Sequence, residues 1–149
     1  MAIDDHYPAL EPVVTIFRDT GLYAYRTLTD ENDWAVAVDL EDGRVDVRIG
    51  DDGYLVEVSA ISTGMFMDEE DDRRRRVLER LARISMPGIR RGMLAEHQDV
   101  DWDVEGEGIA LRSQHMLPFS GAVRIPTFAL NELQELNIQL RIVERQIVE

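Results

Sequence analysis

The 149-residue sequence contains no cysteine and no lysine. Without cysteine, the chain forms no disulfide and offers no thiolate for catalysis or metal binding, and a reducing compartment is compatible with it. No apolar run approaches the roughly 18–20 residues that a membrane-spanning helix needs. The N-terminus, Met1 to His6, also lacks the basic and then apolar layout of a signal peptide. We therefore expect a cytoplasmic protein.

Positive charge is scarce: 30 acidic residues face 16 basic residues, all of them arginine, and the formal net charge is −14. Binding to the phosphate backbone of nucleic acids depends on an excess of cationic side chains. We therefore expect no direct contact with nucleic acid and none with a membrane. The length and the 44% hydrophobic content instead fit one compact domain over residues 1–149, which buries roughly 68–70% of the surface of the unfolded chain.

The clearest pattern is a run of three amphipathic strands. Hydrophobic and polar residues alternate along Trp34–Leu40, Arg44–Ile49 and Tyr54–Ala60. Because successive side chains of a strand point to opposite faces, this alternation predicts an antiparallel sheet with one apolar and one polar face. Asp42–Gly43 and Asp52–Gly53 precede the second and third strands, and such pairs supply the positive-φ residues of tight hairpins.

Helical patterns surround these strands, and a second hairpin follows them. The further expected elements, in chain order, are a helix at Pro8–Thr20, a short strand at Leu22–Leu28 whose place in the sheet stays open, a helix at Asp68–Met86, strands at Asp99–Glu105 and Ile109–Met116, a loop at Pro118–Pro126, and a helix at Thr127–Val148 capped by Thr127. The sequence thus predicts a single α+β domain with an antiparallel sheet of about five or six strands and three helices. The expected order is α-β-β-β-(β)-α-β-β-α.

The middle helix is predicted from an apolar face, an N-cap at Asp68 and a stop at Pro87–Gly88, and the face consists of Val77, Leu78, Leu81 and Ile84. Its first part is a block of charges at residues 68–76. Each arginine from 73 to 76 follows an acidic residue by four positions, as Arg73 follows Glu69. Pairs at this spacing stabilise a helix by about 0.2–0.5 kcal/mol each, and acidic residues favour the N-terminal end of a helix dipole. We interpret the block as a solvated helix face, not as a binding site for an anion or for nucleic acid.

Candidate chemistry is weak throughout the chain. The acidic residues Asp99, Asp101, Asp103 and Glu105 have the spacing of a calcium loop, but a strand separates same-face carboxylates by about 6–7 Å, so we interpret them as a solvated strand face. The histidines His6, His97 and His115 lie far apart, without the spacing of zinc ligands. No serine lies in a nucleophile elbow. We predict no catalytic residue, no metal site and no cofactor.

The last predicted helix has two apolar surfaces. One stripe can pack on the sheet and consists of Leu133, Leu136, Leu140, Val143 and Ile147. Ile138 and Ile142 point away from it, as a surface for a partner or as an incidental pair covered by the loop at 118–126. Met65, Phe66 and Met67 form a third cluster, as core cover or as an adaptable contact surface. These five residues are our candidates for a protein-binding or dimer interface.

A resemblance to a known family rests on several segments together. They are the strand run Val45–Ile49 and Leu55–Ile61, the helix Arg76–Ile84, and a strand that leads through a loop into the last helix. With the overall order of elements, they resemble the type III secretion chaperone-like fold, and within it the YbjN-like family. The resemblance implies a small acidic protein, stress-linked or regulatory and not an enzyme, that dimerises and binds an exposed client segment. It transfers no functional residue to this sequence.

Our hypothesis is a non-enzymatic, chaperone- or adaptor-like module that forms a homodimer and binds a flexible, basic or apolar segment of a client protein. One candidate client is a component of DNA repair or of another nucleic-acid machine. The polar sheet face, with Arg44, Asp46, Arg48 and Glu57, and the sheet edges are the surfaces left for partners. The alternative is a small-molecule-sensing or enzymatic domain that uses the concave sheet face.

Overall fold

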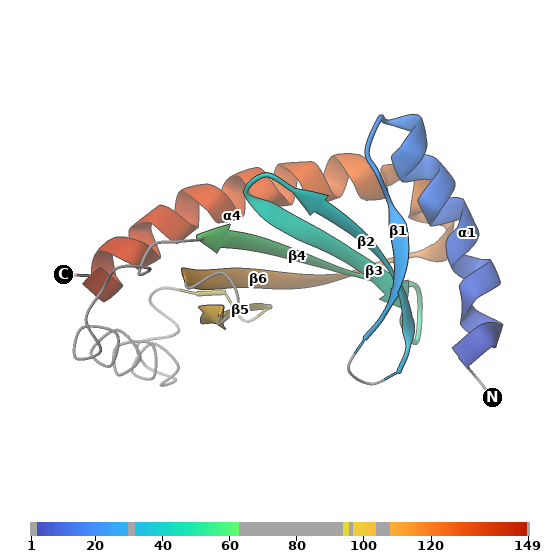
Figure 1. The fold of residues 1–149 in the computed structure, drawn as a ribbon, viewed down its shortest axis with the longest axis horizontal. Helices are drawn as coiled ribbons and strands as arrows, with labels where there is room; N and C mark the ends of the chain where they lie inside the picture. Colours follow the sequence, from blue (N-terminus) through green and yellow to red (C-terminus); the bar gives the residue numbers. More distant parts are fainter. Residues whose placement is uncertain (1–2, 30–31, 63–93, 96, 104–107, 149) are drawn as a thin grey trace.

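The computed structural model describes residues 3–29, 32–62, 94–95, 97–103 and 108–148. The elements, in chain order, are α1 (Ile3–Asp19), β1 (Tyr25–Leu28), β2 (Trp34–Leu40), β3 (Gly43–Ile49), β4 (Tyr54–Ser62), β5 (Gln98–Asp103), β6 (Gly108–Leu117), the 3₁₀ helix η1 (Phe119–Arg124) and α4 (Ile125–Val148). Figure 1 shows a twisted sheet with α4 extended along one face and α1 beside the end formed by β1 and β2. No helix among these residues is both long and apolar enough to cross a bilayer.

All six strands form one antiparallel sheet in the order β1-β2-β3-β4-β6-β5. The three strands predicted between residues 34 and 61 are confirmed, and β1 joins the sheet beside β2. The later hairpin is also confirmed, with β6 between β4 and the edge strand β5. The chain therefore returns to the sheet beside β4, and the hairpin at residues 98–117 completes it.

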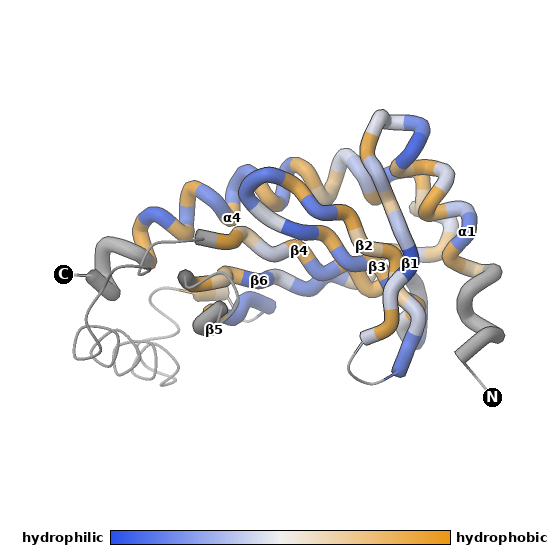
Figure 2. The backbone as a smooth tube through the Cα atoms, in the orientation of Figure 1, coloured by the Kyte–Doolittle hydropathy of each residue, from blue (hydrophilic) through white to orange (hydrophobic). Residues whose placement is uncertain are grey.

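The alternation of side chains divides the sheet into a covered face and a second face that no described helix covers, which we call the open face. Figure 2 shows the corresponding alternation of hydropathy along the strands. On the covered face, Val47 of β3 lies between Val36 of β2 and Val56 of β4, and all three are fully buried. α1 packs on β2 and β3, while α4 packs on β4 and β6. Burying a side chain of this size contributes about 1.5–3 kcal/mol, so the covered face supplies much of the stability.

The predicted fold class needs a correction. It is α+β, as expected, but the structure has six strands and two α-helices among the described residues, not three helices. The middle helix, predicted at Asp68–Met86, falls within residues 63–93, outside the described part of the chain. It was predicted from local signals, namely an apolar face at Val77, Leu78, Leu81 and Ile84, an N-cap and charge pairs. Such local signals do not by themselves determine how many helices a fold contains.

The entrance to the last helix also differs from the prediction. Most of the expected loop at residues 118–126 is the 3₁₀ helix η1, and α4 already begins at Ile125, two residues before the predicted cap Thr127. Pro126 therefore lies in the first turn of α4. That position suits proline, because the first backbone N–H groups of a helix have no partner within it. The proline is thus a helix-start signal that we interpreted as the end of a loop.

The hairpin glycines have a different role from the predicted one. Gly21, after α1, is the one described glycine with a positive φ, at +85°, so Gly43 and Gly53 do not supply left-handed residues. A Cβ atom added to Gly43 would instead lie 2.5 Å from Cδ1 of Leu133 in α4 and even closer to the carbonyl oxygen of Ser59 in β4. Gly43 is therefore needed for close packing of the β2–β3 hairpin against its neighbours.

Candidate functional site

The candidate site is the open face of the sheet, which neither α1 nor α4 covers. Strand pairing aligns its side chains in rows that cross the strands. The first row is Thr27, Ala35, Arg48, Leu55 and Met116; the second is Tyr25, Ala37, Asp46, Glu57 and Gln114; the third is Asp39, Arg44, Ser59, Arg112 and Asp99. An acidic row thus lies between two rows that carry arginines. The polar face predicted from the alternation of β3 and β4 is confirmed.

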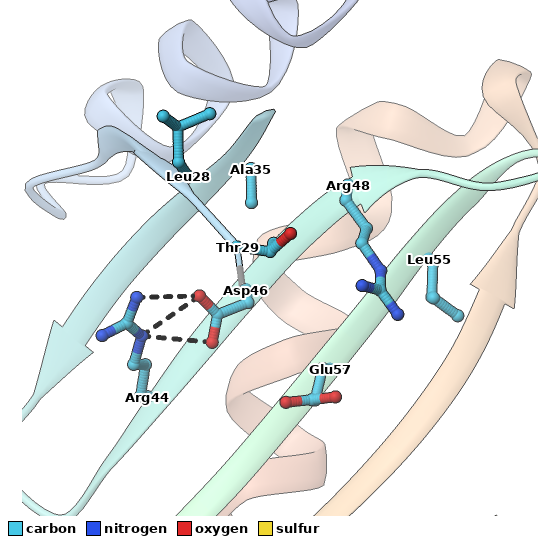
Figure 3. Close-up of a pocket in the computed structure, with 8 residues that line it drawn as sticks. All are labelled: Leu28, Thr29, Ala35, Arg44, Asp46, Arg48, Leu55 and Glu57. Atoms are coloured by element: carbon cyan, nitrogen blue, oxygen red, sulfur yellow. Dashed lines mark hydrogen bonds and ion pairs between the residues drawn. The ribbon is translucent and has the colours of Figure 1, made fainter. Parts of the chain in front are cut away.

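Two neighbouring hollows lie on this face. The first, drawn in Figure 3, is lined by Leu28, Thr29, Ala35, Arg44, Asp46, Arg48, Leu55 and Glu57. The second is lined by Leu55, Glu57, His97, Gln98, Asp99, Arg112, Gln114 and Met116. Because Leu55 and Glu57 belong to both, the hollows form one trough that crosses the sheet from β1 to β5. The small side chain of Ala35 deepens the trough next to β1.

Arg44 and Asp46 form the main charged pair in the first hollow. The Arg44 guanidinium donates from Nε to both Asp46 carboxylate oxygens at 3.1 Å, and its Nη2 lies 3.0 Å from Asp46 Oδ1. Burial raises the pKa of the Asp46 carboxyl above its ordinary value, and the carboxylate of Glu57, directly across on β4, adds to this rise. The Arg44 cation opposes it. The hollow thus holds two carboxylates and two arginines, of which Arg44 is closely paired with Asp46.

Other contacts fix the edges of the trough. Tyr25 Oη donates a short hydrogen bond to Asp39, and this bond, together with partial burial, raises the pKa of Tyr25. At the other side, the Gln114 amide donates to Glu57 Oε2 at 2.8 Å. Sequence reasoning singled out Arg44, Asp46, Arg48 and Glu57, but it missed Arg112 and Gln114. The alternation at Ile109–Met116 would have placed both on one face of a strand, while the pairing of β6 with β4 was not predictable from spacing.

The outer surface of α4 contains the predicted isoleucines. Ile138 is 59% exposed and Ile142 is 55% exposed, with the exposed Leu130 two turns before Ile138. They lie opposite the buried stripe that packs on the sheet, which consists of Leu133, Leu136, Leu140 and Val143. η1 therefore leaves both isoleucines accessible. The other interface candidates, Met65, Phe66 and Met67, lie outside the described residues.

A histidine–glutamate cluster lies at the β5 end of the molecule. His97 precedes β5, His115 belongs to β6 and Glu132 to α4, and one potential ligand atom of each lies within 4.8 Å of the other two. The sequence separates these residues widely, and they meet because β5 pairs with β6 while α4 packs on β6. Among the described residues, this is the group whose side chains could hold a metal ion. Glu132 was not singled out by the sequence.

Comparison of this chain with protein-family models, with curated proteins and with solved structures finds no match. The resemblance to the YbjN-like family therefore stays a prediction.

Proposed function

We propose that this chain is a non-enzymatic protein-binding module that holds a flexible segment of a client protein in the trough on its open sheet face. The observation that carries the proposal is the continuity of the two hollows through Leu55 and Glu57. A surface of this kind accepts an elongated partner more readily than a compact small molecule, since binding pockets for small molecules enclose most of the ligand. A cytoplasmic location, expected from the sequence, is part of the proposal.

The dimensions of the trough support a polypeptide partner. It crosses six strands, and neighbouring strands lie about 4.8 Å apart, so its length is about 24 Å. An extended chain advances about 3.3 Å per residue, so about seven residues fill that length. The row containing Asp46 and Glu57 runs along the trough and offers carboxylates to basic side chains of the client. The net charge of −14 also accelerates the approach of a basic segment through long-range attraction.

Affinity purification from the native cell, with matched variants as bait, tests this proposal. The trough variant carries Arg48→Ala and Glu57→Ala, and the control carries Arg124→Ala and Glu11→Ala, so each loses one exposed or half-exposed arginine and one glutamate. A client should be recovered with the parent and the control but lost with the trough variant. A peptide from that client should then bind the purified parent and control at least about tenfold more tightly than the trough variant.

Equal recovery of every partner by the two variants would contradict the proposal. Tight, salt-sensitive binding of the purified chain to naked DNA would contradict the proposal that its partner is a protein and not nucleic acid. A screen of metabolites by thermal shift provides a further check. Strong stabilisation by one of them, lost in the trough variant, would favour the small-molecule alternative instead.

We also propose that the protein forms a homodimer through the outer surface of α4. Glu135 and Arg141 are both exposed and lie three residues before and three residues after Ile138. In an antiparallel pairing of two copies of α4 about a two-fold axis near Ile138, Glu135 of each copy faces Arg141 of the other. A symmetric dimer requires such self-complementarity, because the same surface serves both subunits. The isoleucines then supply the apolar centre of the interface.

Sedimentation equilibrium of designed variants tests the dimer. Ile138→Asp with Ile142→Asp should weaken dimerisation at least about tenfold, since it buries charge at the centre of the interface. Tyr23→Asp with Val123→Asp adds the same charge at the two most exposed large hydrophobic residues of the described chain and should leave the dimer intact.

A charge exchange gives an independent measurement. Glu135→Arg alone and Arg141→Glu alone should each weaken the dimer, and the two changes in one chain should restore it. A parent that is monomeric at all concentrations, or a dimer unaffected by the isoleucine changes, would show that this surface is not the interface.

A further inference from the structure

The cluster of His97, His115 and Glu132 contains an unusual contact between its two less exposed members. His115 Nε2 lies 3.3 Å from Glu132 Oε1, which is close enough for an ion pair. The nitrogen is nevertheless buried and forms no hydrogen bond. A buried imidazole nitrogen without a hydrogen bond, next to a carboxylate oxygen, leaves both atoms available to a metal ion.

The 3.3 Å between His115 Nε2 and Glu132 Oε1 matches the distance between two ligand atoms of a zinc ion. Ligand atoms at 2.0–2.1 Å from a tetrahedral zinc ion are about 3.3 Å apart. His115 and Glu132 therefore already span one edge of such a tetrahedron. The largest separation in the cluster, at most 4.8 Å, exceeds this edge by about 1.5 Å. His97 is exposed, so rotation of its side chain can close that gap.

The surrounding contacts hold the cluster in place. The backbone carbonyl of His97 accepts a hydrogen bond from the Gln114 N–H at 3.1 Å, which fixes it beside β6. Gln98 and Gln139 exchange two side-chain hydrogen bonds of 2.8 Å and so tie the start of β5 to α4. The His115 ring also packs edge-on against Phe128, with 4.9 Å between ring centroids. Metal sites depend on such supporting contacts, which orient the ligands before the ion binds.

We propose that His97, His115 and Glu132 form a zinc-binding site with three protein ligands. Two imidazole nitrogens and one carboxylate oxygen are a donor set that zinc accepts, and imidazole favours zinc over calcium and magnesium. The site lies at the junction of β5, β6 and α4, and a zinc ion with three protein ligands takes water as its fourth. The acidic surface raises the local concentration of cations. This inference does not depend on the proposed client binding.

Zinc titration of the tag-free chain against a chromogenic chelator tests the site. The titration contains excess magnesium, so that non-specific binding to the acidic surface is suppressed. The parent should bind one Zn²⁺ per chain, and Co²⁺ should give the visible absorption of a tetrahedral complex. His97→Gln should weaken zinc binding more than about tenfold with little effect on folding, because His97 is exposed. His6→Gln is the matched control, since His6 belongs to α1, and it should bind zinc as the parent does.

A second ligand variant separates loss of the site from loss of the fold. Glu132→Gln retains the size of the side chain and should also lose zinc affinity, with an unchanged circular dichroism spectrum. No zinc binding by the parent would overturn the proposal. Binding by His97→Gln or Glu132→Gln that equals that of the parent would overturn it as well, because the ion would then lie elsewhere.

Discussion

Gly43 provides a sharp test of how the β2–β3 hairpin packs. Replacing it by alanine adds one methyl group on the covered face, where the added carbon would lie 2.5 Å from a methyl of Leu133 and closer still to the Ser59 carbonyl oxygen. The leucine side chain can move slightly, but it is 95% buried, and the carbonyl belongs to the backbone of β4. Overpacking of this kind costs about 1–3 kcal/mol, and an immobile backbone contact places Gly43→Ala at about 2–3 kcal/mol.

Two other glycines provide matched controls for the same change. Gly21 has nothing within 4 Å of an added Cβ but has a φ of +85°, so Gly21→Ala should cost about 1–2 kcal/mol through backbone strain alone. Gly121 has a φ of −98° and only an ordinary contact, 3.5 Å from Pro118 Cγ. Gly121→Ala should therefore be neutral or should stabilise the protein by up to about 1 kcal/mol, because alanine restricts the unfolded chain.

Urea unfolding of the three variants measures these free energies directly. The expected order of destabilisation is Gly43→Ala, then Gly21→Ala, then Gly121→Ala. In thermal unfolding, Gly43→Ala should lower the Tm by roughly 4–12 °C for a chain of this size. If Gly43→Ala is as stable as the parent, or if Gly21→Ala is the more destabilised of the two, then close packing is not the reason for glycine at position 43.

Two further predictions concern a carboxyl group and a buried amide pair. The pKa of Asp46 is raised in the folded protein, so its contribution to stability is fully present below the ordinary Asp pKa of about 3.9 and is lost as the pH rises through the raised value. The stability of the parent relative to Asp46→Asn, measured by urea unfolding, should therefore fall over that pH interval. A stability difference that does not change with pH would contradict the raised pKa. Gln139→Ala removes the two side-chain hydrogen bonds between Gln139 and Gln98, whose side chain also accepts from the Ala95 N–H and is 8% exposed. It should destabilise the fold by about 1–3 kcal/mol. Gln134→Ala, at an exposed position of α4, should change stability by less than about 0.5 kcal/mol in the same assay.

The part of the fold that sequence predicted well is the part determined by local pattern. The alternation at residues 34–61 specifies which residues share a face, because a shift of one residue would reverse the two faces of every strand. It therefore gave the strands, their connection and the shared face of Arg44, Asp46 and Glu57. The interpretation of Gly43 was wrong because its role depends on a residue that is distant in the sequence. A turn motif describes the local backbone, whereas the glycine responds to Leu133, which lies 90 positions away in the chain.

The candidate sites differ in the same way: one follows from local pattern and the other from long-range contacts. The arginines and carboxylates of β3 and β4 were found because they alternate within single strands. His97, His115 and Glu132 come together through one strand pairing and one helix–sheet contact, and neither follows from residue spacing. A sequence search for metal ligands at short intervals passes over such a cluster, even though each residue type is suitable.

The position of α4 in the chain has a consequence for how the protein is made. This helix follows every strand of the sheet, yet its buried residues, such as Leu136 and Leu140, cover the apolar side of β4 and β6. Until the ribosome has released residues 125–148, the nascent sheet exposes valines and leucines that have no partner layer. A translating chain stalled before Ile125 is therefore a substrate for chaperones and proteases. Rare codons or pauses within the codons for residues 125–148 should lower the yield of folded protein more than pauses elsewhere.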